Sequence, residues 1–491
     1  MLIAGLSIIF TWLFYKTGIA LNLFIFNAVI ILLYCYLGHL RNGSLNFQTV
    51  LSGTILTAFI VLVNHTRMAI IVNLISLFLL SGLLCYPKAK SLLNSIRLSF
   101  NNILSSQKSF WSHLNQSEYK YFRLSMLVKW IKIIMIPVLI IILFILLYKA
   151  SNPIFNKHFL KIIQVIGEYI RKYISFPLLL TFILGLAISI FLLINNPAKT
   201  IIDSDSTAGI LLQRKRKKSG KFKFNGLRTE LMAGIFLFVI LNLLILAENC
   251  IDIYWIWFNF EWTGEYLKQF VHEGTYLLII SILISIGITL YFFRGNLNFY
   301  TRNKLLKWLS YIWLFQNVIL TISVGVRNYR YIETFALAYK RIGVFFFLAL
   351  VLFGIFTVIY KIRHRLTSFY LFKVNSLAVY IVLVIMTVFN WDIIIARYNF
   401  RNYEKSFVHL DFLSRLSDNA LPYTVKTMDE LSAIDKTQKA IFQFGEKYMS
   451  PVAYHAKMQT RELEFISKWE SKKMLEWSLA GQRAYKKLME K

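Results

Sequence analysis

The sequence has few charged residues for its length, and few of these are acidic. Asp, Glu, Lys and Arg make up 16% of its 491 residues, and 55 basic residues outnumber 24 acidic ones. Soluble domains carry about 25% charged residues, so this composition excludes a mainly water-soluble protein. It excludes a disordered chain as well, because 57% of the residues are hydrophobic and provide ample apolar surface to bury.

Cysteine and intact catalytic motifs are also scarce. Cys35, Cys85 and Cys250 are too few for a disulfide framework and lie in or beside apolar blocks, as small buried hydrophobic residues do. The sequence contains no Cys/His metal spacing, Walker loop or dinucleotide glycine pattern. His272-Glu-Gly-Thr-Tyr276 has the first half of a zinc-protease motif, but a tyrosine replaces its second histidine. We therefore predict no catalytic residues, no metal site and no cofactor.

The sequence is rich instead in long runs of Leu, Ile, Phe and Val. A helix of roughly 20 apolar residues crosses the hydrocarbon core of a bilayer, whereas barrel strands alternate in polarity. We therefore predict an all-α, polytopic membrane protein with about 11 transmembrane helices (10–12). The predicted spans are 2–15, 18–38, 47–63, 68–86, 130–148, 174–195, 230–247, 275–293, 306–326, 342–360 and 374–391. Whether the short block 2–15 spans fully stays open.

The basic residues concentrate in alternate connections between these blocks. Residues 87–128, 196–228, 294–307 and 361–373 are strongly basic, and cytoplasmic loops carry such an excess of Lys and Arg. We therefore expect a cytoplasmic N-terminus and an extracytoplasmic C-terminus. The net charge of +31 does not require a nucleic-acid partner, and we expect the run Arg214–Lys218 to contact anionic lipid.

Two loops on the predicted outer side are basic against this rule, namely 149–173 and 327–341. The acidic segment 248–273 lies on the same side and offers carboxylate partners. Structural ion pairing is the favoured interpretation, and an anion-binding pocket is the alternative. If 327–339 is helical, then Arg327, Arg330 and Tyr331 share one face.

These polar residues gather where the later spans end on the predicted outer side. The candidate outer-face cluster comprises His272, Glu273, Arg327, Arg330, Tyr331, Arg341, Asn390, Asp392, Arg397 and Tyr398. Beyond the transmembrane domain 1–391, residues 392–491 form a polar C-terminal region. Leu463, Ile466 and Trp469 recur there at helical spacing. We predict a small helical extracytoplasmic region that offers a docking surface for a protein partner.

One motif after the last span is similar to that of a known family. Asn390-Trp-Asp-Ile-Ile-Ile-Ala-Arg-Tyr-Asn399 and the following Leu410–Pro422 resemble a bacterial multi-pass membrane family classified only as a domain of unknown function. The segments at 152–155, 272–274 and 327–341 resemble it too, although Phe412 replaces a tyrosine of the family pattern. The resemblance covers about residues 1–425. It implies a multi-pass protein of the bacterial inner membrane and no established activity.

Three functions remain open from the sequence. The preferred one is a non-enzymatic binding, regulatory or complex-forming membrane component that acts through its outer face. The second is a transporter or lipid-handling protein for an anionic solute or headgroup, since arginine recognises phosphate and carboxylate groups. The third is an enzyme that uses His272 and Glu273 on a lipid-linked substrate, but adjacent helical residues point about 100° apart.

Overall fold

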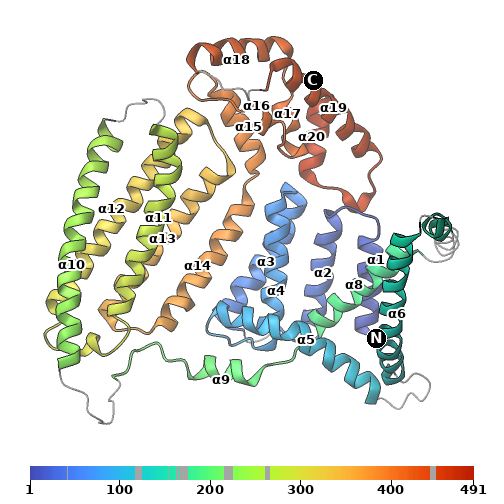
Figure 1. The fold of residues 1–491 in the computed structure, drawn as a ribbon, viewed down its shortest axis with the longest axis horizontal. Helices are drawn as coiled ribbons and strands as arrows, with labels where there is room; N and C mark the ends of the chain where they lie inside the picture. Colours follow the sequence, from blue (N-terminus) through green and yellow to red (C-terminus); the bar gives the residue numbers. More distant parts are fainter. Residues whose placement is uncertain are drawn as a thin grey trace.

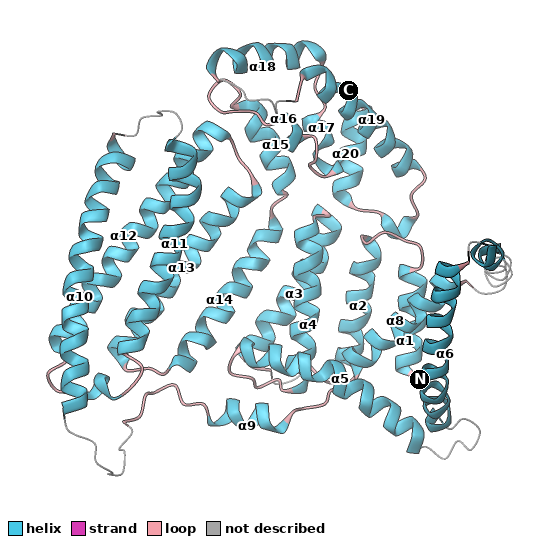
Figure 2. Ribbon diagram, in the orientation of Figure 1, coloured by secondary structure: helices cyan, strands magenta, loops and turns pink. Residues whose placement is uncertain are grey.

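The structure, a computed structural model, describes residues 1–40, 43–116, 124–152, 154–161, 164, 175–214, 225–259, 266–442 and 449–490. Side chains at 115–116, 124–132, 136, 225 and 266–273 also lie outside the described part. Within these ranges the chain is helical apart from connections and an isolated antiparallel bridge between Leu211 and Leu366 (Figure 2).

The predicted transmembrane blocks are confirmed as helices. Nine helices of the described ranges are long and apolar enough to cross a membrane, and two shorter apolar helices accompany them. The long ones are α3 (Leu45–Asn64), α4 (Arg67–Cys85), α6 (Leu124–Ser151), α8 (Phe176–Leu193), α10 (Asn225–Asp252) with the π-helix η1 (Ile253–Phe258), α11 (Tyr266–Phe292), α12 (Lys304–Phe335), α13 (Tyr339–His364) and α14 (Ser368–Val388). The short ones are α1 (Leu2–Phe14) and α2 (Leu21–Tyr36). The chain is a polytopic α-helical membrane protein.

The helices form two bundles with α14 between them (Figure 1). In the first bundle, α1 to α4 and α8 pack around buried residues such as Tyr34 and Leu80. In the second bundle, α10 to α13 pack around residues such as Phe238 and Leu314. The α14 residue Tyr380 donates to Ser76 Oγ of α4 at 2.9 Å. Its hydroxyl occupies the space that a side chain at position 53 would need, so glycine is required there.

Buried amides join helices, as such side chains do in membranes. Asn27 of α2 donates to Asn73 Oδ1 of α4 at 3.0 Å. In the second bundle, Gln316 of α12 donates to Asn242 Oδ1 of α10 at 2.7 Å. Asn375 of α14 donates to Thr357 Oγ1 of α13 at 3.0 Å, which ties the central helix to the second bundle.

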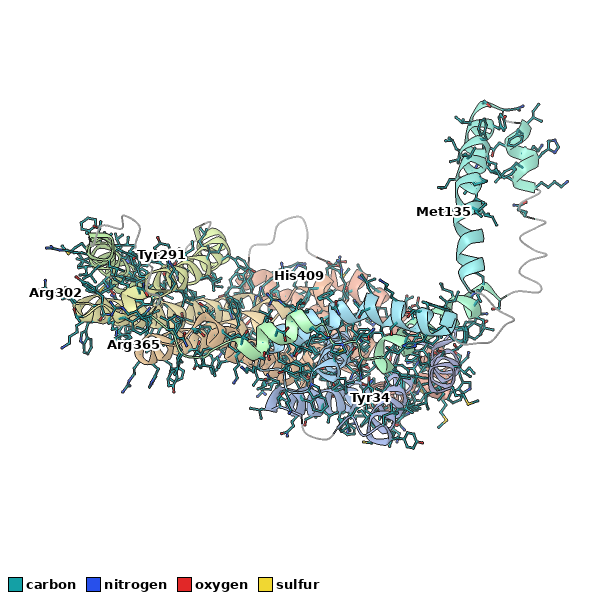
Figure 3. The ribbon with its side chains drawn as sticks, turned by 90° about the horizontal axis from the view of Figure 1, so that it is seen from below. Tyr34, Met135, Tyr291, Arg302, Arg365 and His409 are labelled. Carbon is teal, nitrogen blue, oxygen red and sulfur yellow. The ribbon has the colours of Figure 1, made fainter. Side chains whose placement is uncertain are left out.

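Two helices lie outside this packing pattern. The amphipathic helix α5 (Leu92–Gln116) packs against α4 and α8 at the end of the first bundle. Because polar residues interrupt its apolar ones, a search for continuous apolar runs does not find this helix. Helix α6, which carries Met135, stands away from both bundles (Figure 3), and nearly all its described side chains are exposed. Between Ile133 and Leu147 the described side chains are all apolar, and such a surface suits contact with lipid.

The end of the bundles that carries α5 also carries the basic connections, and we call it the basic face. There, the linker 194–214 with α9 (Lys199–Thr207) connects the two bundles (Figure 1). Its buried Asp205 accepts hydrogen bonds from Lys90 N at 2.9 Å and Asn94 Nδ2 at 2.7 Å. At its other end, Leu212 N donates to Arg365 O at 2.8 Å. The short 3₁₀ helix η2 (Asn296–Phe299) lies on the same face between α11 and α12.

The C-terminal helices form a cap over the opposite end of the bundles, which we call the cap face (Figure 1). They are α15 (Trp391–Arg401), α16 (Leu410–Leu413), η3 (Asp418–Ala420), α17 (Leu421–Thr424), α18 (Met428–Ile441), α19 (Pro451–Glu470), η4 (Met474–Glu476) and α20 (Leu479–Met489). The cap touches the first bundle where Gly18 N donates to Glu476 Oε1 at 2.9 Å. It touches the second bundle where Asn399 exchanges hydrogen bonds of 2.8 and 3.1 Å with the Leu337 backbone.

Candidate functional site

Arg327 forms a buried ion pair between α12 and α10. Its guanidinium is bonded to the Asp252 carboxylate, and the two residues are only 3% and 1% exposed. Ser323 Oγ donates to the second Asp252 oxygen at 2.6 Å, and Glu248 lies 3.8 Å from the guanidinium. The acidic segment 248–273 therefore does supply a partner for a basic residue of 327–341, as the charge distribution predicts. A buried pair of this kind holds the two helix ends in register.

Arg330 also has a partner, at the edge of the same helix end. It forms an ion pair with Glu333 at 3.2 Å and donates to the Trp257 carbonyl oxygen of η1 at 3.4 Å. Both side chains are partly exposed, so the pair contributes little to stability. Tyr398 of α15 lies close to Glu333, and its pKa is raised by burial and then by Tyr329 and Glu333.

A cavity of about 320 Å³ lies beside these pairs, between the ends of α11, α12 and α13 and the cap. It is lined by Thr275, Tyr276, Asn328, Tyr331, Ala338, Tyr339, Lys340, Arg341, Val344 and Phe412. Of the candidate cluster, the structure therefore brings Tyr331 and Arg341 together in one cavity. The α11 residue Gly274 lies next to Arg327, because a Cβ added there would be 3.5 Å from Arg327 Nη1.

Arg341 is held rigidly at this cavity. Its guanidinium stacks over the Tyr331 ring at 4.4 Å and donates to the carbonyl oxygens of Phe335, at 2.5 Å, and of Ala336. These carbonyls end α12, where Ala336 adopts a positive φ of 59°. Among the described residues no carboxylate pairs with Arg341. Within the described part of the chain, the cavity therefore presents a preoriented guanidinium that no carboxylate pairs.

Thr275 lines the same cavity and carries a buried hydroxyl. The residue is 6% exposed, and its Oγ1 has no hydrogen-bond partner within the described part of the chain. An unpaired buried hydroxyl costs free energy, so a polar ligand that reached this hydroxyl from the cavity would recover that cost. No sequence pattern marks Thr275, because its importance arises only where α11 approaches α13.

Asp392 links the cavity to the cap. It accepts hydrogen bonds from the Tyr339 hydroxyl, which lines the cavity, and from the Ser417 hydroxyl of the cap. Burial raises the pKa of the Asp392 carboxyl, although hydrogen bonding from Ser417 opposes that rise. Asn390 begins the same helix, since its side chain accepts from Ile393 N at 3.4 Å. Its Nδ2 also donates to Asn64 O of α3 at 3.3 Å.

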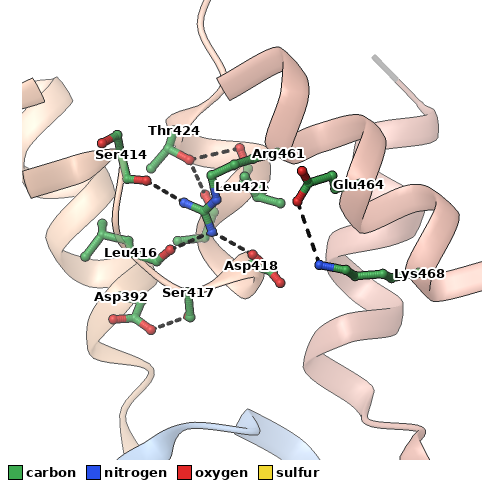
Figure 4. A network of polar contacts seen from close by, with 11 residues as sticks. Asp392, Ser414, Leu416, Ser417, Asp418, Leu421, Thr424, Arg461, Glu464 and Lys468 are labelled. Carbon is green, nitrogen blue, oxygen red and sulfur yellow. Dashed lines mark hydrogen bonds and ion pairs between the residues drawn. The ribbon is translucent and has the colours of Figure 1, made fainter. Parts of the chain in front are cut away.

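A clamp around Arg461 fixes the loop that carries Ser417 (Figure 4). Arg461 of α19 donates to the carbonyl oxygens of Ser414 at 2.6 Å and Leu416 at 2.9 Å. It also donates to Asp418 Oδ1 at 2.6 Å. No sequence pattern marks Arg461 for this role, because the groups that it binds are mainly backbone carbonyls.

Arg397 points away from the cavity, into a separate groove on the cap. Its guanidinium lies 4.2 Å from the Tyr423 ring and donates to the Tyr423 hydroxyl at 2.8 Å. Lys487 approaches the same ring at 4.0 Å. The groove measures about 830 Å³, with Arg401, Lys426, Glu430 and His455 in its walls. The side chains of His272 and Glu273 lie outside the described residues, so their predicted roles stay predictions.

The comparisons with known proteins identify the family of this chain. The family described as Domain of unknown function (DUF4153) matches residues 8–427, a range that includes the cavity, Asp392 and Asn399. No curated protein and no solved structure matches the chain. The match covers most of the sequence and ends just after α17, before the last helices of the cap. This integral membrane protein therefore belongs to the family described as a domain of unknown function, DUF4153.

Proposed function

We propose that this protein is a non-enzymatic binding or regulatory component of a bacterial inner membrane that acts through its cap face. The cavity beneath the cap carries this proposal. It combines the fixed guanidinium of Arg341 with the exposed side chain of Lys340. Its wall also includes Thr275, whose buried hydroxyl has no partner among the described residues. Such a set suits an anionic group, because guanidinium and ammonium groups form strong charge-assisted hydrogen bonds with phosphate and carboxylate.

The position of the cavity suits a ligand that reaches the protein at the membrane boundary. Thr275 and Val344 lie near the ends of candidate spans, whereas Phe412 belongs to the cap. Asp392 joins Tyr339 of the cavity wall to Ser417 of the cap. Binding in the cavity would therefore change contacts that hold the cap in place, which gives a regulatory component a route to the cap surface.

The proposed orientation places the cap outside the cell and the basic face in the cytoplasm. The support is the excess of Lys and Arg in the connections of the basic face. The two termini lie toward opposite faces in Figure 1, with the N-terminus near the basic face. We further propose that the cap groove around Arg397 and Tyr423 receives a protein partner. The run Arg214–Lys218, of which the structure describes Arg214, would contact anionic lipid.

Ligand retention tests the proposal. The protein is purified from native membranes as wild type, as Lys340→Gln and as a control, Arg401→Gln, in which an exposed base of the cap groove is removed instead. Bound small molecules are extracted and identified by mass spectrometry. We expect an anionic compound that accompanies the wild type and the control and is lost from Lys340→Gln. Identical small-molecule profiles from all three proteins would contradict the proposal.

Transport or lipid handling is the second candidate function. The observation in its favour is that the cavity wall includes residues of the spans as well as of the cap. Uptake or efflux of the identified compound by proteoliposomes distinguishes the two functions. Movement of the compound across the membrane favours transport, and binding without movement favours the regulatory component.

A further inference from the structure

Six basic residues gather where the second bundle ends on the basic face. Arg294 follows α11, Arg302, Lys304 and Lys307 lie around the start of α12, and Arg363 and Arg365 end α13. We call these six residues the basic patch. Figure 3 looks at the molecule from this side and labels Arg302 and Arg365 at the same end of it. The patch lies on the opposite face from the cavity and does not depend on the proposed function.

The patch brings like charges from different helices together. Lys307 of α12 is close enough to Arg365 for the two positive charges to repel each other. Arg363 interacts electrostatically with Tyr311, which lies one turn further along α12. The ion pairs of the described residues include none of the six bases. Repulsion between uncompensated charges costs free energy, and a bound anion would remove that cost.

Aromatic rings hold two of these bases in place. The Arg294 guanidinium lies 3.8 Å from the centre of the Tyr291 ring, and that of Arg365 lies 5.4 Å from the Phe299 ring. Cation–π contact of this kind limits the movement of a long side chain. The guanidinium groups are thus partly ordered before any anion arrives.

An exposed apolar stripe begins beside the patch. Leu305, Trp308 and Ile312 are 55%, 67% and 47% exposed. Their spacing places them on one face of α12. This stripe starts at the charged end of the helix and continues toward its middle. A charged group at the interface and apolar surface below it match the two parts of a phospholipid.

We propose that the basic patch is a binding site for an anionic phospholipid of the adjacent leaflet. Lys307 and Arg365 bind the phosphate and the charged headgroup, and the acyl chains lie along Leu305, Trp308 and Ile312. A basic pocket between transmembrane helices is a known physical solution for binding such headgroups. A phospholipid is favoured over free phosphate as the ligand, because only a lipid has acyl chains that would pack against the exposed apolar stripe.

Lipid binding by charge variants tests this proposal. The purified full-length protein is mixed with phosphatidylglycerol or phosphatidylcholine, and bound lipid is counted by native mass spectrometry. The variant Lys307→Gln/Arg365→Gln removes two charges of the patch. The control Lys108→Gln/Lys199→Gln removes two exposed charges elsewhere on the same face. The variant Lys307→Arg/Arg365→Lys keeps both patch charges, so it separates loss of charge from faulty folding.

The expected results follow from the charge lost. We expect wild type to prefer phosphatidylglycerol and the Gln variant of the patch to bind it about thirtyfold more weakly, roughly fivefold per base. The control and the charge-keeping variant should stay within about fivefold of wild type. Equal weakening in the patch variant and the control would overturn the site. Displacement of the lipid by millimolar inorganic phosphate would overturn the choice of a lipid as its ligand.

Discussion

Replacing Thr275 by valine tests the cavity most simply, because the two side chains have almost the same shape. The Thr275 hydroxyl is buried at 6% exposure and has no partner among the described residues. Removing an unpaired buried hydroxyl recovers part of a desolvation cost of about 1–3 kcal/mol. We therefore expect the ligand-free Thr275→Val protein to be more stable than wild type by about 1 kcal/mol.

A matched control lies on the same helix. Thr289 is fully buried, but its hydroxyl donates to Ser285 O at 2.9 Å. The Thr289→Val variant therefore loses a satisfied hydrogen bond, and we expect it to lose about 0.5–1.5 kcal/mol. Thermal unfolding of delipidated protein in detergent measures both variants. Opposite signs of the two shifts support the reasoning. Equal destabilisation by both substitutions would refute it, because Thr275 would then have a partner.

Three further predictions concern the contacts around the cavity. Asp252→Asn leaves the buried Arg327 charge without its main partner and should lower the free energy of unfolding by about 3–5 kcal/mol. Size-exclusion chromatography should show this as a loss of monodisperse protein, with recovery in the double variant Asp252→Leu/Arg327→Met. An unchanged yield of Asp252→Asn would contradict the role of the pair. Because burial raises the pKa of Asp392, the folded state holds its proton more tightly than the unfolded state. The free energy of unfolding should therefore fall as pH rises from about 4 toward that raised pKa. Asp392→Asn should flatten this pH dependence. An identical pH profile of stability in the variant would count against a raised pKa at Asp392. Arg461→Gln should speed amide hydrogen exchange at residues 414–418 about tenfold, whereas Lys468→Gln, which breaks only a surface pair of 3.7 Å, should not.

The transmembrane helices could be predicted because each one corresponds to one continuous apolar run in the sequence. Helix α5 could not, since its apolar residues are interspersed with polar ones and its place depends on packing against α4 and α8. The position of the linker 194–214 likewise could not be predicted from the sequence. Its position depends on contacts between residues far apart, such as Asp205 with Asn94.

The candidate cluster illustrates the same limit for polar residues. Loop charge indicates that the basic residues of 327–341 find partners in 248–273, and helical spacing places Tyr331 on the same face as Arg327. Spacing along one helix cannot reveal which side chains from other helices converge. Arg397 therefore fell into the same predicted cluster as Arg341, although it faces a different groove. Sequence analysis misses Thr275, because a threonine becomes distinctive only through its surroundings: its hydroxyl is buried without a partner among the described residues, in the wall of a cavity that Arg341 also lines.

Accessibility of the two faces in intact cells tests the account most directly. In a background in which Cys35 and Cys250 are replaced by alanine, single cysteines are introduced by Ala440→Cys in the exposed part of α18 and by Ser204→Cys on α9. A membrane-impermeant maleimide is added from the periplasmic side. We predict labelling of the Ala440→Cys protein and none of the Ser204→Cys protein until the cells are lysed. Labelling of the Ser204→Cys protein alone would place the cap in the cytoplasm and contradict a function at the outer face.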